Sequence, residues 1–323
     1  MDKPSAKYEV IYEIVSQDGN LQNVKELCEI AGVSKSGYYN WIRSADKRAE
    51  KEAKDKADFE LILEAYQFRG YSKGIRGVHM RLLHLDPPVI INTKKIQRLM
   101  KKYGLKCPFR GPNPYKKMAK ATEESTVAPN LVKREFRKHG PRKVLLTDIT
   151  YLFFRDEKCY LSVIKDAYTK EVLAYVVSVT MVDDIVEDTL QQLMEKHGST
   201  LTKDTIIHSD QGSQYKSRKI ADFLKDHELQ RYMSRKANCW DNAPQESFFG
   251  HMKDEIDLSE CTSFQDVVAA IDDYMDYYNT ERYQWDLAKL APVEYYQYCV
   301  TGDYPLAGIC KPPSRGSAPD PEV

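Results

Sequence analysis

The segment that most constrains the fold is an apolar run, residues 144–154, with an aspartate, Asp148, near its centre. The aliphatic, β-branched and aromatic residues around Asp148 are typical of a buried strand. A carboxylate inside such a strand is costly unless it is paired or bound to a cation. We therefore expect other chemical groups to converge on Asp148 from elsewhere in the chain.

Two other acidic residues lie in suitable contexts. Ile206 and Ile207 predict a short strand that leads to Asp210, and 35 residues separate Asp210 from Glu246. We expect Glu246 in the first turn of a helix. Carboxylates that come from separate elements suit Mg²⁺, which takes oxygen ligands. Two such ions, about 3.5–4 Å apart, stabilise the attacking and leaving oxygens when a phosphodiester is cut or joined.

The segments around these acids resemble a known family. Residues 208–215 read His-Ser-Asp-Gln-Gly-Ser-Gln-Tyr, and residues 238–249 read Asn-Cys-Trp-Asp-Asn-Ala-Pro-Gln-Glu-Ser-Phe-Phe. Both resemble motifs of the transposases of the IS-three family of bacterial insertion sequences, within the superfamily of DDE transposases and retroviral integrases. The likeness covers roughly residues 20 to 300 and includes a basic residue, Lys253, seven positions after Glu246. Ala237 and Gln284 depart from it, since the family usually has glycine and often histidine there.

The resemblance implies a function and a set of site residues. Asp148, Asp210 and Glu246 would be both the catalytic residues and the ligands of two Mg²⁺ ions, for which Mn²⁺ could substitute. The substrates would be the terminal repeats of an insertion element and a target DNA. Cleavage at the element ends would be followed by strand transfer through a circular intermediate. Asp241 is the rival of Glu246, but the spacing and the position of Lys253 favour Glu246.

The order of predicted elements indicates the fold class. From residue 143 onward, three strands joined by tight turns are followed by alternating helices and strands, which matches an α/β ribonuclease-H-like (integrase) core. In that fold the first and fourth strands are neighbours, so Asp148 and Asp210 would meet at one edge of the sheet. Residues 24–43 predict a helix-turn-helix with a turn at Gly32 and an N-cap at Ser34. Two all-α DNA-binding modules would thus precede the core.

The charge distribution supports a DNA-binding front half. Residues 1–143 hold 30 Lys+Arg and 17 Asp+Glu, a net charge of +13, and the remainder holds 18 and 31, a net charge of −13. A basic half suits phosphates and an acidic half suits metal ions. The candidate DNA-binding residues are Lys35, Ser36, Tyr39, Asn40, Arg76, Lys94, Lys95, Arg98, Arg235, Lys236, Lys253 and Arg282. Two alternatives stay open: residues 24–43 could be an ordinary helical hairpin, and Arg282 could cap the domain instead of contacting DNA.

The predicted domains follow from these segments. They are a helix-turn-helix (1–45), a second small helical DNA-binding module (46–105), a basic linker (106–142), the catalytic core with C-terminal helices (143–300) and a disordered tail (301–323). No apolar run reaches membrane-spanning length, and seven cysteines without a Cys-x-x-Cys pair favour reduced thiols. We expect a cytoplasmic, nucleoid-associated protein without a membrane partner.

The partners and two alternative functions complete the expectations. The protein would act as a homo-oligomer on DNA, and it could be fused to or paired with the product of an upstream reading frame, as often occurs in the IS-three family. One alternative is a catalytically inactive DNA-binding regulator of transposition. The other is a structure-specific nuclease that uses the same site without strand transfer.

Overall fold

The computed structural model describes residues 4–17, 22–71, 73–107, 139–155, 157–180, 183–210, 212–233 and 243–311. The chain divides into two compact units, Met1–Leu63 and Glu64–Val323. Most of the predicted linker lies outside the described residues. The same is true of three residues discussed above: Arg235, Lys236 and Asp241. Among the residues described, no helix is long and apolar enough to cross a membrane.

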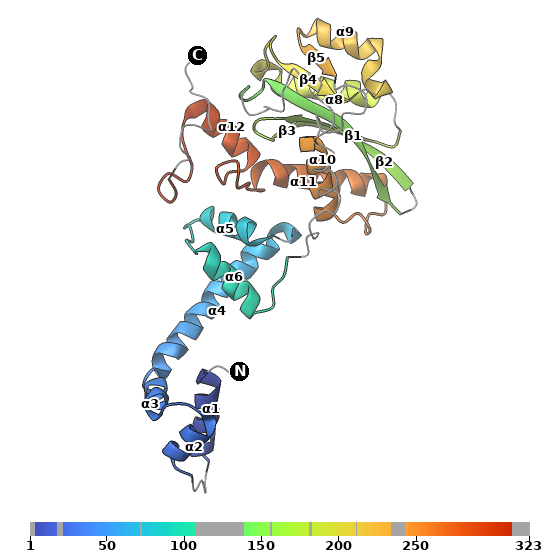
Figure 1. Ribbon diagram of the computed structural model, residues 1–323. Helices are drawn as coiled ribbons and strands as arrows, with labels where there is room; N and C mark the ends of the chain where they lie inside the picture. Colours follow the sequence, from blue (N-terminus) through green and yellow to red (C-terminus); the bar gives the residue numbers. More distant parts are fainter. Residues whose placement is uncertain are drawn as a thin grey trace, which may run out of the picture. The chain divides into compact units, whose positions relative to one another are not determined.

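The first unit contains the predicted helix-turn-helix (Figure 1). Its helices are α1 (Pro4–Val15), α2 (Val24–Ala31) and α3 (Lys35–Arg43). Gly32 ends α2 with a φ of 64°, which favours glycine, and the Ser34 hydroxyl caps α3 by accepting the Gly37 N–H at 3.1 Å. Ile11, Leu27, Cys28 and Tyr38 form the buried core. The predicted turn and cap are therefore confirmed.

Residues 45–67 form one continuous helix, α4 (Ala45–Gln67). This charged, alanine-rich stretch contains no Gly or Pro, so nothing in it interrupts a helix. The division between the two units falls within α4 and not at residue 45, where we placed a domain boundary. Two shorter helices follow, α5 (Ile75–Leu83) and α6 (Thr93–Lys102).

The core of the second unit is a five-stranded sheet with the order β3-β2-β1-β4-β5. Its strands are β1 (Val144–Phe154), β2 (Glu157–Asp166), β3 (Val172–Ser178), β4 (Ile206–Ser209) and β5 (Gln230–Met233). β1 pairs antiparallel with β2, and β2 with β3, whereas β4 runs parallel to both β1 and β5. The predicted adjacency of the first and fourth strands is confirmed.

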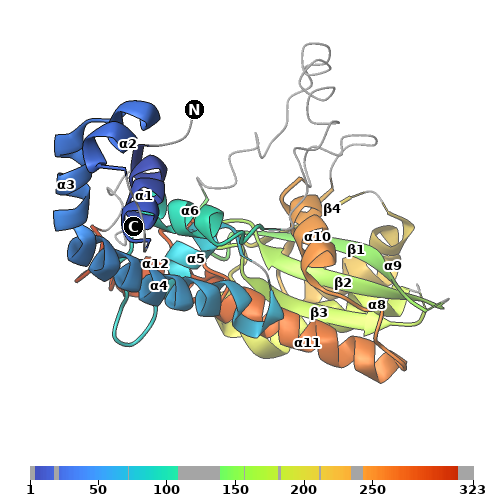
Figure 2. The same cartoon turned by 90° about the horizontal axis from the view of Figure 1, so that it is seen from below.

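Helices cover both faces of this sheet (Figures 1 and 2). They are α8 (Asp183–His197), α9 (Arg218–Asp226), α10 (Ala243–Glu255) and α11 (Phe264–Thr280). The last helix, α12 (Pro292–Thr301), belongs to a separate apolar cluster with Leu287 and Tyr304. Side chains of α8 and α9 pack with Leu145 and Ile207 on one face. Side chains of α10 and α11 pack with Leu152, Phe154 and Leu161 on the other. The helix that carries Glu246 therefore lies on a defined face of the sheet.

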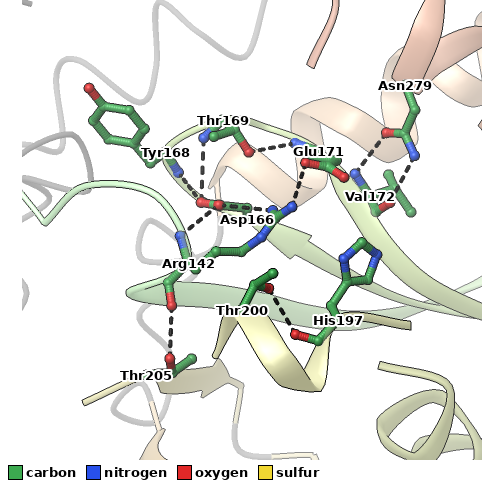
Figure 3. Close-up of polar contacts among 10 residues, drawn as sticks. All are labelled: Arg142, Asp166, Tyr168, Thr169, Glu171, Val172, His197, Thr200, Thr205 and Asn279. Atoms are coloured by element: carbon green, nitrogen blue, oxygen red, sulfur yellow. Dashed lines mark hydrogen bonds and ion pairs between the residues drawn. The ribbon is translucent and has the colours of Figure 1, made fainter. Parts of the chain in front are cut away.

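A buried ion cluster fastens the start of β1 to the turn between β2 and β3 (Figure 3). The Arg142 guanidinium lies 3.3 Å from Asp166 and 2.8 Å from Glu171, and the Tyr168 N–H donates to Asp166 at 2.8 Å. Asn279 of α11 binds the backbone N–H and C=O of Val172. These contacts give the Asp166 carboxylate a structural role as the counter-charge of Arg142.

The prediction of a disordered tail from residue 301 onward is wrong for its first residues. Tyr304 and Leu306 are buried, at 9% and 3% exposure, and they pack with Leu287 and Tyr295 of the same unit. Their apolar side chains are too few to form a recognisable periodic pattern in the sequence. Residues 312–323 lie outside the described part of the chain.

Candidate active site

Asp148 lies at the fifth position of β1, between a fully buried first half and a half-exposed second half. The Ile149 N–H donates to its carboxylate at 2.8 Å. Burial, together with the like charges of Asp210 and Glu246, raises the pKa of Asp148 to about 7. The two acids that the sequence pairs with Asp148 thus act on it electrostatically in the folded chain.

Asp210 follows directly after β4, and strand register brings it towards Asp148. β1 and β4 pair from Val144 with Ile206 to Leu146 with His208, so continuing the register by two residues places Asp210 beside Asp148. Both strands are interior to the sheet, and on this register the two acids would lie side by side where β4 ends. The Asp210 carboxylate accepts the Gly212 N–H at 2.8 Å. A Cβ on Gly212 would lie 3.0 Å from that carboxylate, so glycine permits this tight turn.

Glu246 lies in the first turn of α10, as predicted. Its side chain is exposed, whereas Phe248, Phe249 and Met252 of the same helix are buried against the sheet. Lys253 lies in the last turn, with its ammonium 4.8 Å from the ring centre of Tyr151 on β1. The helix therefore presents both Glu246 and Lys253 beside the strand that carries Asp148.

The donor set fits a hard divalent cation. All three candidate ligands are carboxylates, and a bound cation would offset the burial and the like charges that raise the pKa of Asp148. Within the described residues, however, no group of three His, Cys, Asp or Glu side chains has the arrangement needed to hold a metal ion. Asp210 and Glu246 both act on the pKa of Asp148, but the three carboxylates do not surround a common point.

Two residues that the sequence did not single out support this site. The buried Tyr215 hydroxyl lies 3.2 Å from the Thr147 hydroxyl, and burial with the charges of Asp148 and Asp210 raises its pKa. Its place in the 208–215 motif is the signal that could have identified it. His208 is also buried and stacks on Tyr232 at 5.3 Å between ring centres, which favours a role in the fold.

Lys165, with Tyr215, is the other residue that the sequence did not single out. It links the sheet to α10, the helix that carries Glu246. Its side chain is on the same face of the sheet as Asp148, since Leu146 pairs with Lys165 and Asp148 with Val163. The ammonium donates to the Pro244 carbonyl at 2.6 Å and lies 5.0 Å from the Phe248 ring centre. Only 2% of Lys165 is exposed. A lysine in an apolar strand was the available sequence signal.

Replacing Lys165 by methionine should separate stability from activity. Burial lowers the pKa of Lys165 to about 7, so between pH 10 and 7 the unfolded chain binds a proton that the folded chain does not. This difference in proton binding lowers the free energy of unfolding, and the loss is complete below pH 7. We expect Lys165→Met to raise Tm at pH 7, with a smaller gain at pH 10. We also expect up to about a hundredfold slower DNA cleavage, since Glu246 loses its anchor.

Thermal denaturation at both pH values and a cleavage assay measure these effects. Lys225→Met, at an exposed position in α9, is the matched control. Unchanged cleavage would contradict the anchoring role of Lys165, and a Tm at pH 7 below that of the wild type would contradict the cost assigned to burying its amine.

The predicted DNA-binding residues that the structure describes differ in their exposure and in their contacts. Lys35, Ser36, Tyr39, Asn40, Lys94 and Arg98 are exposed on their helices, and Lys95 is half-buried. The Arg76 guanidinium lies 5.1 Å from the Trp285 ring centre. Arg282 is held by Glu255, with its Nη2 2.7 Å from Oε1 and its Nε 2.9 Å from Oε2. Of the two roles open for Arg282, this geometry favours the structural one.

Comparison with known proteins places the chain in a class that agrees with this architecture. Two models described as "Integrase core domain" match residues 138–239 and 246–298, and a model described as "HTH-like domain" matches residues 52–113. The class is therefore that of integrase-core proteins with a helical DNA-binding region, and the core has the predicted ribonuclease-H-like fold. The catalytic core domain of HTLV-2 integrase, solved with magnesium, is 14% identical, with a TM-score of 0.39 over 49% of this chain and 97% of that one.

The relatives narrow the class to a family. InsK, the transposase assigned to insertion sequence IS150 of Escherichia coli K12, is 34% identical over 271 residues, which is 84% of this chain and 92% of InsK. The 31 kDa protein of insertion element IS600 from Shigella sonnei is 28% identical, over 83% and 97%. The transposase InsF of IS3A from Escherichia coli K12 is 26% identical, over 81% and 90%. The chain belongs to this family of insertion-sequence transposases.

Proposed function

We propose that this protein is a DNA transposase that binds the ends of an insertion element, cleaves them and joins them to target DNA. The single observation that carries the proposal is the placement of three acids in an integrase-core sheet: Asp148 on β1, Asp210 directly after the neighbouring strand β4, and Glu246 in the first turn of α10, which packs against β1. Membership of the transposase family supports the same reaction class.

The three carboxylates would hold two Mg²⁺ ions, or Mn²⁺ in their place. When bound, these ions supply activation of a water or a DNA 3′-hydroxyl and stabilisation of the departing oxygen. Asp148 and Asp210 are fixed by the register of β1 with β4, and Glu246 is fixed through α10. The protein itself forms no covalent bond to DNA in this scheme, since the attacking group is an oxygen of water or DNA.

The DNA-binding surfaces are part of the same proposal. Lys35, Ser36, Tyr39 and Asn40 are exposed on α3, the second helix of the helix-turn-helix, where side chains can reach base edges and phosphates. The exposed basic residues of α6, Lys94 and Arg98 among them, suit phosphate contacts. We propose that the protein assembles as a homo-oligomer on the paired ends and that an upstream-frame product can serve as a partner.

A strand-transfer assay tests the function. A labelled duplex that carries the terminal repeat of the element is incubated with supercoiled target DNA and Mg²⁺. We expect a branched or integrated product in which the labelled 3′ end is joined to the target. Cleavage without joining would identify the structure-specific nuclease instead, and end binding without any cleavage would identify the regulator.

A further inference from the structure

A hollow of about 650 Å³ lies between the tip of the β1–β2 hairpin and the C-terminal part of α10. β1 supplies Tyr151 and Phe153, and Arg155 follows them. Lys253 lines the other wall, and the segment 256–259 after α10 closes the end. A space of this volume is within the range that small-molecule sites occupy.

Two aromatic rings at this hollow have no role in the core. Leu152 and Phe154 alternate with them along β1 and are buried, at 6% and 3% exposure. Tyr151 and Phe153 are instead 50% and 61% exposed, with their ring centres 5.4 Å apart at an angle of 71°. Adjacent exposed aromatic side chains on a strand indicate a binding surface, since the fold gains little from them.

Cationic groups surround these rings. The ammonium of Lys158 lies 4.8 Å from the ring centre of Tyr151 and 5.0 Å from that of Tyr160. The Lys253 ammonium lies 4.8 Å from the same Tyr151 ring, and Arg155 lines the hollow. Asp257 is the one acidic residue of the lining. Aromatic faces interleaved with positive charge are the recurring chemistry of single-stranded nucleic-acid sites.

The position of the hollow relates it to the three carboxylates. Tyr151 follows Asp148 by three residues, about 10 Å further along the same strand, so its ring lies on the opposite face of the sheet from the Asp148 side chain. Lys253 links the two faces, because it follows Glu246 by about 10 Å along α10, which packs on the Asp148 face, and its ammonium contacts the Tyr151 ring. β4 pairs with β1 only as far as Leu146, so a DNA strand whose reacting phosphate lies at the carboxylates can pass around this edge of β1 and reach the hollow within a few nucleotides.

We propose that Tyr151 and Phe153 form a stacking site for an unpaired nucleotide next to the reacting phosphate. This inference rests on the proposed function, because the carboxylates define where the strand is cut. The occupant is single-stranded DNA and not duplex, since the base faces inside a duplex are covered by neighbouring bases. Lys158 and Lys253 would hold the backbone of that strand, and the rings would hold the base.

Fluorescence of 2-aminopurine tests the proposal directly. The probe is a terminal-repeat duplex with a short single-stranded overhang that contains 2-aminopurine, and a blunt duplex of the same sequence is the reference. We expect the wild-type protein to quench the overhang base. Phe153→Leu and Tyr151→Leu, which keep apolar volume but remove the ring, should relieve the quenching and weaken overhang binding by roughly 5- to 150-fold. Tyr151→Phe should retain both properties.

Three outcomes would overturn the stacking site. Unchanged quenching in both leucine variants would show that the base lies elsewhere. An equal loss of affinity for blunt duplex would show a general effect on DNA binding, and a change in oligomeric state by light scattering would show that the rings form an interface between copies of the chain. Ile90→Ala, at another exposed apolar residue, is the control, and equal Tm values verify folding.

The readout is independent of the chemical step. If the wild-type protein failed to cleave DNA but the leucine variants lost quenching, the stacking site would stand and the transposase proposal would fail. If cleavage and joining occurred with quenching unaffected, the stacking site alone would be wrong.

Discussion

Replacing Asp210 by asparagine should lower the rate of element-end cleavage on the order of a thousandfold or more while leaving end binding unchanged. An asparagine side chain can still accept the Gly212 N–H that Asp210 now accepts at 2.8 Å, so the turn after β4 is kept. It lacks the negative charge that a divalent cation needs. Single-turnover cleavage and a gel-shift titration on the same labelled duplex measure the two effects.

Asp226→Asn provides the control for this substitution. Asp226 is exposed at the end of α9, away from the three carboxylates in the sequence and on an element that contributes none of them. Its replacement should change neither cleavage nor binding. Full cleavage activity in Asp210→Asn would remove Asp210 from the site, and a parallel loss of end binding would mean that the substitution acts through folding.

Replacing Glu255 by alanine should destabilise the second unit by about 3–5 kcal/mol. The Glu255 carboxylate makes a two-point contact with Arg282 and accepts the Tyr274 hydroxyl at 3.1 Å. Only 5% of the Glu255 side chain and 20% of the Arg282 side chain are exposed. Removing the carboxylate leaves a buried guanidinium without its counter-charge. Chemical denaturation monitored by tryptophan fluorescence gives the free energy of unfolding.

The double variant separates the charge effect from the packing effect. Replacing Glu255 and Arg282 together by methionine should recover most of the stability, because apolar side chains of similar volume can replace a buried ion pair at little cost. Glu260→Ala, at an exposed acid beyond α10, should be neutral. If Glu255→Ala were as stable as the wild type and Arg282→Met instead abolished DNA binding, Arg282 would be a DNA contact after all.

The sequence predicted the strands, the helix-turn-helix and the pairing of the first strand with the fourth, because each depends on local patterns or on a known topology. A run of aliphatic, β-branched and aromatic residues identifies β1, and Gly32 with Ser34 marks a turn and a cap. The adjacency of Asp148 and Asp210 follows once β1 and β4 are assigned to neighbouring parallel strands. In these cases, the information lies within a few residues or within a known topology.

Contacts between distant side chains could not be predicted in this way. Lys165 and Pro244 are 79 positions apart, and no periodic pattern relates them. Arg282 looked like a DNA-binding residue because its partner, Glu255, lies 27 positions earlier, at the end of α10. The role of Tyr304 and Leu306 was missed because isolated apolar residues in a loop resemble an unfolded tail until the surface that they cover is known. Tertiary packing decides each of these three cases.

The most direct measurement of the central claim is the metal dependence of end cleavage, for the wild type and for Glu246→Gln. The labelled terminal-repeat duplex is incubated with Mg²⁺, Mn²⁺, Ca²⁺ or EDTA. We predict nicking or joining at the terminus with Mg²⁺ and Mn²⁺, none with EDTA, and loss of both reactions in Glu246→Gln with end binding intact. Cleavage that persists in EDTA, or that Glu246→Gln retains in full, would contradict a carboxylate site that works through divalent cations.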